Sequence, residues 1–225
     1  MLFKESQTLK QKVKKTNLLI ALAIVICTTA SAQFNNAVGI KAGANYSQFR
    51  PDFKIEGYKV LDFQAKMGYY AGGFFNVGVS ERASIRPELL FANQGTRTSS
   101  EIVFEKPNEP PMAGEVVTIW NELVLLLPIN FRYKVVERLY VEAGLQAGYA
   151  IKRTEVVKKI DFDPSLEGHK ETHSDIDRFD LGLNGGLSFD ATDILELHFR
   201  YSYGLLERDN TYKTSVFNLG LGIKI

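Results

Sequence analysis

Residues 217–225 alternate strictly between apolar side chains and small or polar ones. The first parity holds Phe217, Leu219, Leu221, Ile223 and Ile225, and the second holds Asn218, Gly220, Gly222 and Lys224. Alternate side chains of a β-strand point to opposite faces, so this pattern predicts a strand with one apolar face. An apolar face with no covering layer is typical of a transmembrane barrel, whose last strand must pair with its first.

The same alternation recurs along the chain and predicts seven further strands. With the last one, the expected strands are residues 38–47, 67–79, 85–91, 117–133, 139–151, 179–190, 195–204 and 217–225. The fourth is the least regular because residues 123–127 are apolar on both parities and Pro128 follows them. Proline removes a ladder donor, so we expect a bulge or a missing bond there. The predicted fold class is all-β, an eight-stranded antiparallel up-and-down transmembrane β-barrel.

The connections between these strands are of two kinds. Glu81, Glu137 and Asp193 mark tight turns at equal spacing, whereas residues 50–63, 97–115 and 153–175 are expected to be long polar loops, with a shorter loop at 207–210. Short turns at one rim and long loops at the other are typical of outer-membrane barrels, with the turns in the periplasm.

Charged residues fall on the parity that also carries the glycines. The predicted lumen ion network consists of Lys41, Arg86, Glu88, Glu122, Glu142, Asp180, Glu196, His198, Arg200 and Lys224. A soluble barrel would place its apolar residues inside instead. Eight strands leave an interior only wide enough for side chains, where buried charges must pair. We therefore expect a structural, plugged lumen, and the alternative is a small porin-like channel.

The N-terminal region reads as a targeting segment. Basic residues 4–15, an apolar stretch 18–29 and the small residues Ala30-Ser31-Ala32 predict a signal peptide over residues 1–32, which leaves 33–225 as the barrel domain. The single cysteine, Cys27, would leave with it, so no disulfide is expected. Residues 33–225 hold 22 basic and 25 acidic residues, a net charge of −3 that is close to neutral and argues against a nucleic-acid partner. We expect export to the outer membrane.

Three groups of residues contain types that occur in catalytic, metal-binding or recognition sites. Folding the hairpin at Thr192-Asp193 would set Ser188 beside His198 and Asp190 opposite Glu196, a set of residue types that a nucleophilic enzyme of the lipase type could use. These side chains would point into a packed lumen, so we interpret them as hydrogen-bonding groups. His169, Glu171, His173, Asp175 and Asp177 cluster without a helical pattern, and residues 107–111 are rich in proline. We interpret both as surface loops and expect no catalytic residues, no metal and no cofactor.

Several stretches resemble the PorT-like outer-membrane β-barrel family of Gram-negative bacteria, also described as porin-family proteins. They are residues 39–47, Arg86-Pro87-Glu88-Leu89-Leu90-Phe91 with Gln94-Gly95, Leu126-Leu127-Pro128 with Phe131-Arg132-Tyr133, residues 139–144, and residues 218–222. The resemblance implies a barrel of OmpA- or OmpX-like size. Its namesake supports secretion across the outer membrane, but no residue set here carries that role over. Such barrels often end on an aromatic residue, whereas this chain ends on Ile225.

The partners expected from this interpretation are outer-membrane lipid, the barrel-assembly machinery during insertion, and envelope, adhesion or secretion proteins that contact the loops. We expect a non-enzymatic protein. A soluble ligand-binding barrel is the remaining alternative.

Overall fold

The computed structural model describes residues 36–51, 53–55, 58–104, 112–161, 164–174, 176–209 and 212–225. The expected signal peptide and the proline-rich stretch 107–111 lie outside these residues. Among the described residues, no helix is long and apolar enough to cross a membrane.

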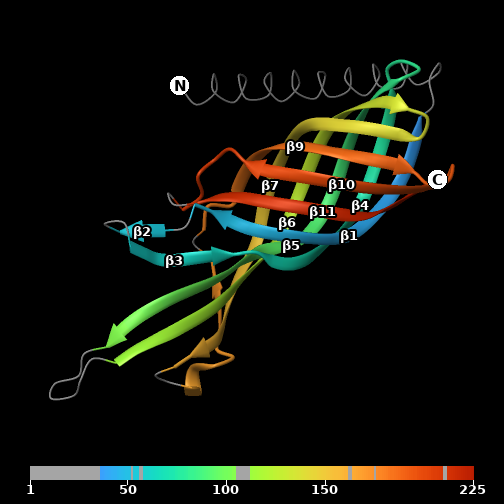
Figure 1. The fold of residues 1–225 in the computed structure, drawn as a ribbon. Coiled ribbons are helices and arrows are strands. Elements are labelled where there is room, and N and C mark those ends of the chain that lie inside the picture. The colour runs from blue at the N-terminus through green and yellow to red at the C-terminus, as the bar shows by residue number, and fades with distance from the viewer. Residues whose placement is uncertain are drawn as a thin grey trace, which may run out of the picture.

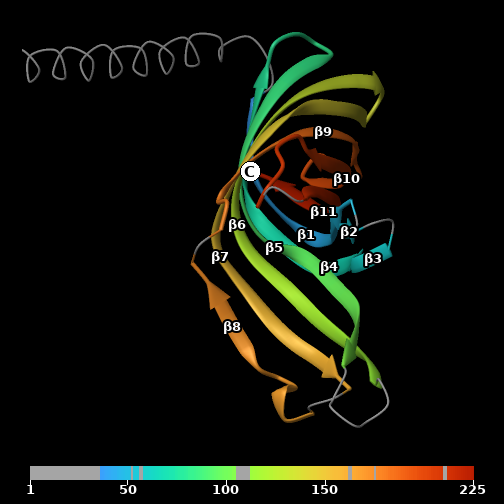
Figure 2. The same ribbon diagram turned by 90° about the vertical axis from the view of Figure 1, so that its left-hand side faces the viewer.

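Antiparallel strands form a closed ring (Figures 1 and 2). In ring order the strands are β1 (Ala37–Arg50), β4 (Lys66–Gly78), β5 (Ala83–Phe104), β6 (Met112–Val136), β7 (Leu139–Ile160), β9 (Phe179–Asp190), β10 (Leu195–Gly204) and β11 (Lys213–Lys224). Three short strands and a 3₁₀ turn add to it: β2 (Phe53–Ile55), β3 (Tyr58–Gln64), β8 (Lys170–His173) and η1 (Pro164–Leu166). β3 pairs with β2 and β5, and β8 pairs with β7.

The seam between the first and last strands closes as the sequence predicts. β1 pairs with β11 from Gly39 opposite Lys224 to Arg50 opposite Lys213. The two apolar parities share one face in this register, because Ile40 lies opposite Ile223 and alternate residues follow in step. Closure leaves neither of these strands with an open edge.

The two faces of the ring differ in the expected sense. On β1 and β11 the apolar parity is exposed, and Ile40, Leu219 and Leu221 have exposed fractions of 55%, 61% and 49%. The glycine-bearing parity faces inward and holds buried charges such as Lys41. This is the inverse of a water-soluble barrel, because the large apolar side chains are outside and the ionised ones are inside.

Three segments expected to be loops contain strands among their described residues, which corrects the interpretation of residues 50–63, 97–115 and 153–175. β5 and β6 stay paired beyond the ring, from Ala83 opposite Tyr133 to Phe104 opposite Met112. We call residues 97–104, 112–119, 154–160 and β8 the projecting sheet, which extends away from the ring in Figure 2. Apolar residues occupy both parities there, as at Val116 and Val117, so the alternation that identifies a strand is lost.

Pro128 disturbs the ladder as expected, but without a bulge. The β5–β6 pairing stops at Pro87 opposite Ile129 and resumes in the same register at Leu90 opposite Leu126. The bulges of β6 against β7 lie elsewhere, near residues 117, 123 and 134. The short turns also fall where predicted. The turn between β6 and β7 consists of Glu137 and Arg138, and Arg138 takes a φ of 69° to reverse the chain.

Candidate functional site

The interior nearer the short turns contains a continuous ion-pair network, which we call the lower network. Its cations are Lys41, Arg86, Arg132 and Arg200, and its carboxylates are Glu88, Glu142 and Glu196. All seven side chains are buried. They come from β1, β5, β6, β7 and β10, so the network joins strands on opposite sides of the ring.

Two carboxylates of the lower network receive forked contacts. Arg86 donates to both oxygens of Glu196 at 2.5 and 2.7 Å, and Arg200 donates to both oxygens of Glu88 at 2.8 and 2.7 Å. Lys41 Nζ lies 2.8 Å from the same Glu88. Bidentate, charge-assisted contacts of this kind are the strongest hydrogen bonds that side chains form. The strands that carry them are therefore fixed relative to one another.

Glu142 connects the two forks. Arg132 Nε and Arg200 Nη2 lie 2.8 and 3.0 Å from its oxygens, and Ser188 donates its hydroxyl to it at 2.8 Å. Aromatic faces cover the remaining guanidinium surface, since Arg86 lies 4.3 Å above the ring of Phe74 and Arg132 lies 4.3 Å above that of Tyr140. The lower network is thus compensated by charge and by cation–π contacts, as a buried cluster must be.

An apolar layer and a second ion-pair network, which we call the upper network, lie further from the short turns than the lower network. The layer contains Tyr70, Leu90, Ala92, Val124 and Leu126, and the Tyr70 hydroxyl contacts the His198 ring. In the upper network Glu122 accepts from Arg153 at 2.7 Å and from Arg208 at 2.7 and 3.1 Å. Glu122 therefore belongs to a separate cluster from the other predicted lumen charges.

An aromatic cluster lies beside the upper network. Phe49 stacks on Tyr212 with ring centroids 4.1 Å apart, and Trp120 and Phe63 meet them edge-on or tilted at about 6 Å. Tyr212 also contacts Arg153 and donates to Asp209 at 2.8 Å. Ions, an apolar layer, more ions and aromatic rings therefore succeed one another along the lumen.

The remaining predicted residues lie at the margins of these clusters. Lys224 pairs with Asp190 at 2.6 Å near the short-turn rim, and Asp180 accepts from Thr214 at 2.6 Å. The sequence-based set omitted several buried partners, namely Asn76, Arg132, Arg153, Arg208 and Tyr212. Arg132 had a readable signal, because it lies on the inward parity directly opposite Glu142. Arg153 and Arg208 lay in segments interpreted as loops.

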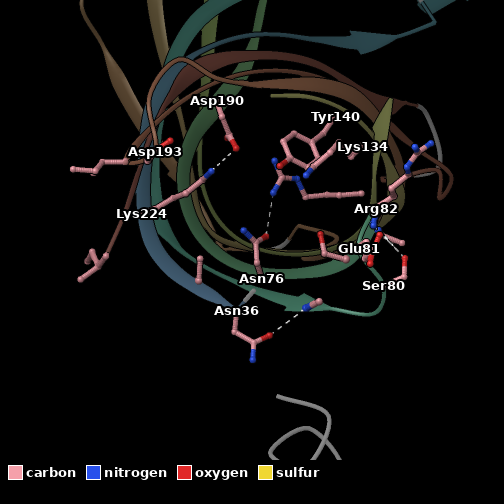
Figure 3. Close-up of a pocket in the computed structure, with 17 residues that line it drawn as sticks. Asn36, Asn76, Ser80, Glu81, Arg82, Lys134, Tyr140, Asp190, Asp193 and Lys224 are labelled. Atoms are coloured by element: carbon pink, nitrogen blue, oxygen red, sulfur yellow. Dashed lines mark hydrogen bonds and ion pairs between the residues drawn. The ribbon is translucent and has the colours of Figure 1, made fainter. Parts of the chain in front are cut away.

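A polar cavity opens at the short-turn rim (Figure 3). It has a volume of about 800 Å³, and Figure 3 shows Tyr140, Lys134, Asp190 and Lys224 around it. Asn76 and Arg132, which belong to the lower network or contact it, line it too. The cavity is therefore a vestibule that reaches the lower network from one side.

The side chains that could have formed a nucleophilic site are engaged elsewhere. The predicted register is correct, with Ser188 opposite His198 and Asp190 opposite Glu196. However, Ser188 bonds Glu142 and Arg132, His198 contacts Tyr70, and Asp190 pairs with Lys224. The structure does not assemble Ser188, His198 and Asp190 into a triad.

The histidine-rich segment is also organised differently from a metal site. His173 lies on β8, and its Nε2 is 3.3 Å from Glu155 on β7. Asp177 donates its backbone N–H to Asp209, and Asp175 lies outside the described residues. Within the part of the chain that the structure describes, no three His, Cys, Asp or Glu side chains could together hold a metal ion.

Comparison with known proteins assigns this architecture. The family model described as "Outer membrane protein beta-barrel domain" matches residues 31–223. The chain belongs to this family. Proteins of this family lie in the outer membrane, so the exposed apolar face of the ring faces the lipid of that membrane. None of the curated proteins matches this chain.

The likeness to one solved structure supports the fold, and two others are similar to a lower degree. Neisserial surface protein A (NspA) superimposes with a TM-score of 0.50 at 11% identity, covering 85% of this chain and 100% of that one. Ail, the attachment invasion locus protein of Yersinia pestis, gives a TM-score of 0.47 at 12% identity with the same coverage. OprG from Pseudomonas aeruginosa gives 0.37 at 13% identity over 87% of this chain and 98% of its own. At these identities the likeness concerns the fold alone.

Proposed function

We propose that this protein is an eight-stranded, non-conducting outer-membrane barrel whose projecting sheet contacts other molecules outside the cell. The single observation that supports it most is the succession of buried networks and aromatic rings along the lumen. Two ion clusters with an apolar layer between them occupy the described interior, and unpaired charges would be costly there. A protein built this way acts through its exterior.

The route to the membrane is part of the proposal. Residues 1–32 act as a cleaved signal peptide, the barrel-assembly machinery inserts residues 33–225, and outer-membrane lipid surrounds the exposed apolar band. The short turns then face the periplasm and the projecting sheet faces outward. Envelope, adhesion or secretion proteins are the partners proposed for that sheet. The PorT-like assignment rests on residues 39–47, 86–91 with 94–95, 126–128 with 131–133, 139–144 and 218–222.

Conductance of the purified, refolded barrel in planar bilayers tests the closed lumen. We expect no steady single-channel currents from the wild type, with a reference porin in the same bilayers as the positive control. Heat-modifiable migration on gels should first show that the protein added is folded. Discrete, steady current steps from the folded wild type would contradict the proposal.

A narrow channel is the alternative that one observation favours. The vestibule of about 800 Å³ already leads from the short-turn rim to the lower network. The double variant Arg86→Ala/Glu196→Ala removes one cation and one carboxylate from that network. It should still leave the barrel closed, because the upper network and aromatic cluster remain. Currents that appear in this double variant alone would locate the closure in the lower network.

A further inference from the structure

A second cavity lies on the lipid-facing side of the ring, at the seam of β1 and β11. Its volume is about 960 Å³. Its lining is formed by Tyr46, Gln48, Arg50, Pro51, Asp62, Phe63, Gln64, Ala65, Tyr203, Glu207 and Lys213. Tyr46, Gln48 and Arg50 continue the outward parity of β1, so this seam groove opens to the exterior, and Phe63 of the aromatic cluster contributes to its lining.

The depth of the seam groove follows from the residues along β1. Outward positions are apolar up to Tyr46 and become polar at Gln48 and Arg50. β11 changes in step, because Phe217 lies opposite Tyr46 and Lys213 lies opposite Arg50. An aromatic belt followed by polar residues marks the boundary between hydrocarbon and headgroups. Tyr203 lines the groove beside this boundary.

Two cations face each other at the upper end of the groove. Arg50 and Lys213 are cross-strand partners, and like charges directly opposite one another are destabilising. Arg50 donates to the Gln48 amide at 3.0 Å, and Lys213 comes no nearer than 3.8 Å to Glu207, whose side chain is 65% exposed. Asp62 also lines the groove and accepts from Gln64 at 3.3 Å. Within the described residues no carboxylate forms an ion pair with Arg50.

We propose that the seam groove binds a phosphate group of an outer-leaflet glycolipid. This inference rests on the proposed function, because it needs the barrel in a membrane with its projecting sheet outside. Arginine and lysine side chains suit phosphate oxygens, and an anion between Arg50 and Lys213 relieves their repulsion. The tyrosines below it suit the sugar and the start of the acyl chains, since their rings are amphipathic.

Binding of purified bisphosphorylated lipid A to the folded, detergent-solubilised barrel, followed by native mass spectrometry, tests the site. The double variant Arg50→Gln/Lys213→Gln should bind roughly 30-fold more weakly, because each interfacial cation contributes about fivefold in affinity and the two factors multiply. The matched control is Lys152→Gln/Lys158→Gln, which removes the same charge from exposed positions on β7. It should bind like the wild type.

Three outcomes would overturn the inference. Equal binding by the seam variant and the wild type would show that the groove is not the site, and equal losses in both double variants would show a diffuse effect of charge. Inorganic phosphate that competes at the same concentration as lipid A would show a free-anion site. Failure of the wild type to fold or to float with phospholipid vesicles would instead contradict the proposed membrane function, so the two failures are distinguishable.

Discussion

The ring and the projecting sheet share β5, β6 and β7, yet the side chains of these strands meet different environments in the two regions. Within the ring, β5, β6 and β7 have one face toward lipid and one toward buried ions. Beyond it, the same strands carry exposed pairs such as Lys159 with Glu115 at 3.0 Å, whose side chains are 50% and 39% exposed. The difference shows that the environment on each face, and not the backbone pairing, decides which residues a strand position accepts.

The energetic consequences differ in the same way. A buried charge whose partner is removed costs several kcal/mol, whereas an exposed ion pair contributes little because water and salt screen it. The ring is also closed, so every strand depends on two neighbours, while the projecting sheet ends in free edges. Disturbances in the ring should therefore propagate, and those in the projecting sheet should stay local.

The largest effect is expected from removing the last strand. Deletion of residues 217–225 removes the partners of β1 from Gly39 to Tyr46 and of β10 from Leu195 to Tyr201, and unpaired backbone groups are not tolerated in lipid. Heat-modifiable folding in detergent should be lost. The matched change in the projecting sheet replaces residues 99–117 by a two-residue turn between the paired Thr98 and Thr118. That variant should still fold, and retained folding of the strand deletion would refute the seam argument.

A smaller contrast separates single carboxylates in the two regions. Glu142→Gln weakens the contacts of Arg132 and Arg200 in the buried lower network, and we expect a loss of about 3–5 kcal/mol in the free energy of unfolding. Glu155→Gln in the projecting sheet removes only the contact with His173 and should cost less than about 1 kcal/mol. Urea unfolding in lipid vesicles measures both. Equal losses would show that the lower network is screened like a surface.

The ring was predictable from sequence because lipid and a narrow lumen impose opposite chemistry on alternate residues. Residues 179–190 and 195–204 were predicted with the ends that β9 and β10 have. The pairing of the first strand with the last, with both apolar parities on the outer face, followed from the alternation in the two segments, and the structure adds the register, in which Ile40 lies opposite Ile223. Where this alternation is lost, as around Val116 and Val117, pairing leaves no local signature and the projecting sheet was taken for loops.

The identity of the interior partners was only partly predictable. The inward parity identified carboxylates such as Glu122 and Glu196, but not which cations they meet. Arg208 reaches Glu122 from β10–β11, and Arg86 reaches Glu196 across the lumen. Such pairs join residues far apart in the sequence, so they depend on how the ring closes rather than on local spacing.

The smallest expected effect concerns protonation in the projecting sheet. Hydrogen bonds from Ser99 and then Lys159 lower the pKa of Glu115 below its usual range. A lowered folded-state pKa means that the stabilisation is present above the unfolded value and is lost as pH falls through the folded one. Ser99→Ala should therefore raise the Glu115 pKa more than Lys159→Gln does, as measured by NMR titration of its carboxyl carbon. Neither variant should alter urea unfolding of the ring at pH 7, because exposed pairs contribute little there. A shift of that transition by either one would show that the projecting sheet and the ring unfold as one unit, and would remove the distinction between them.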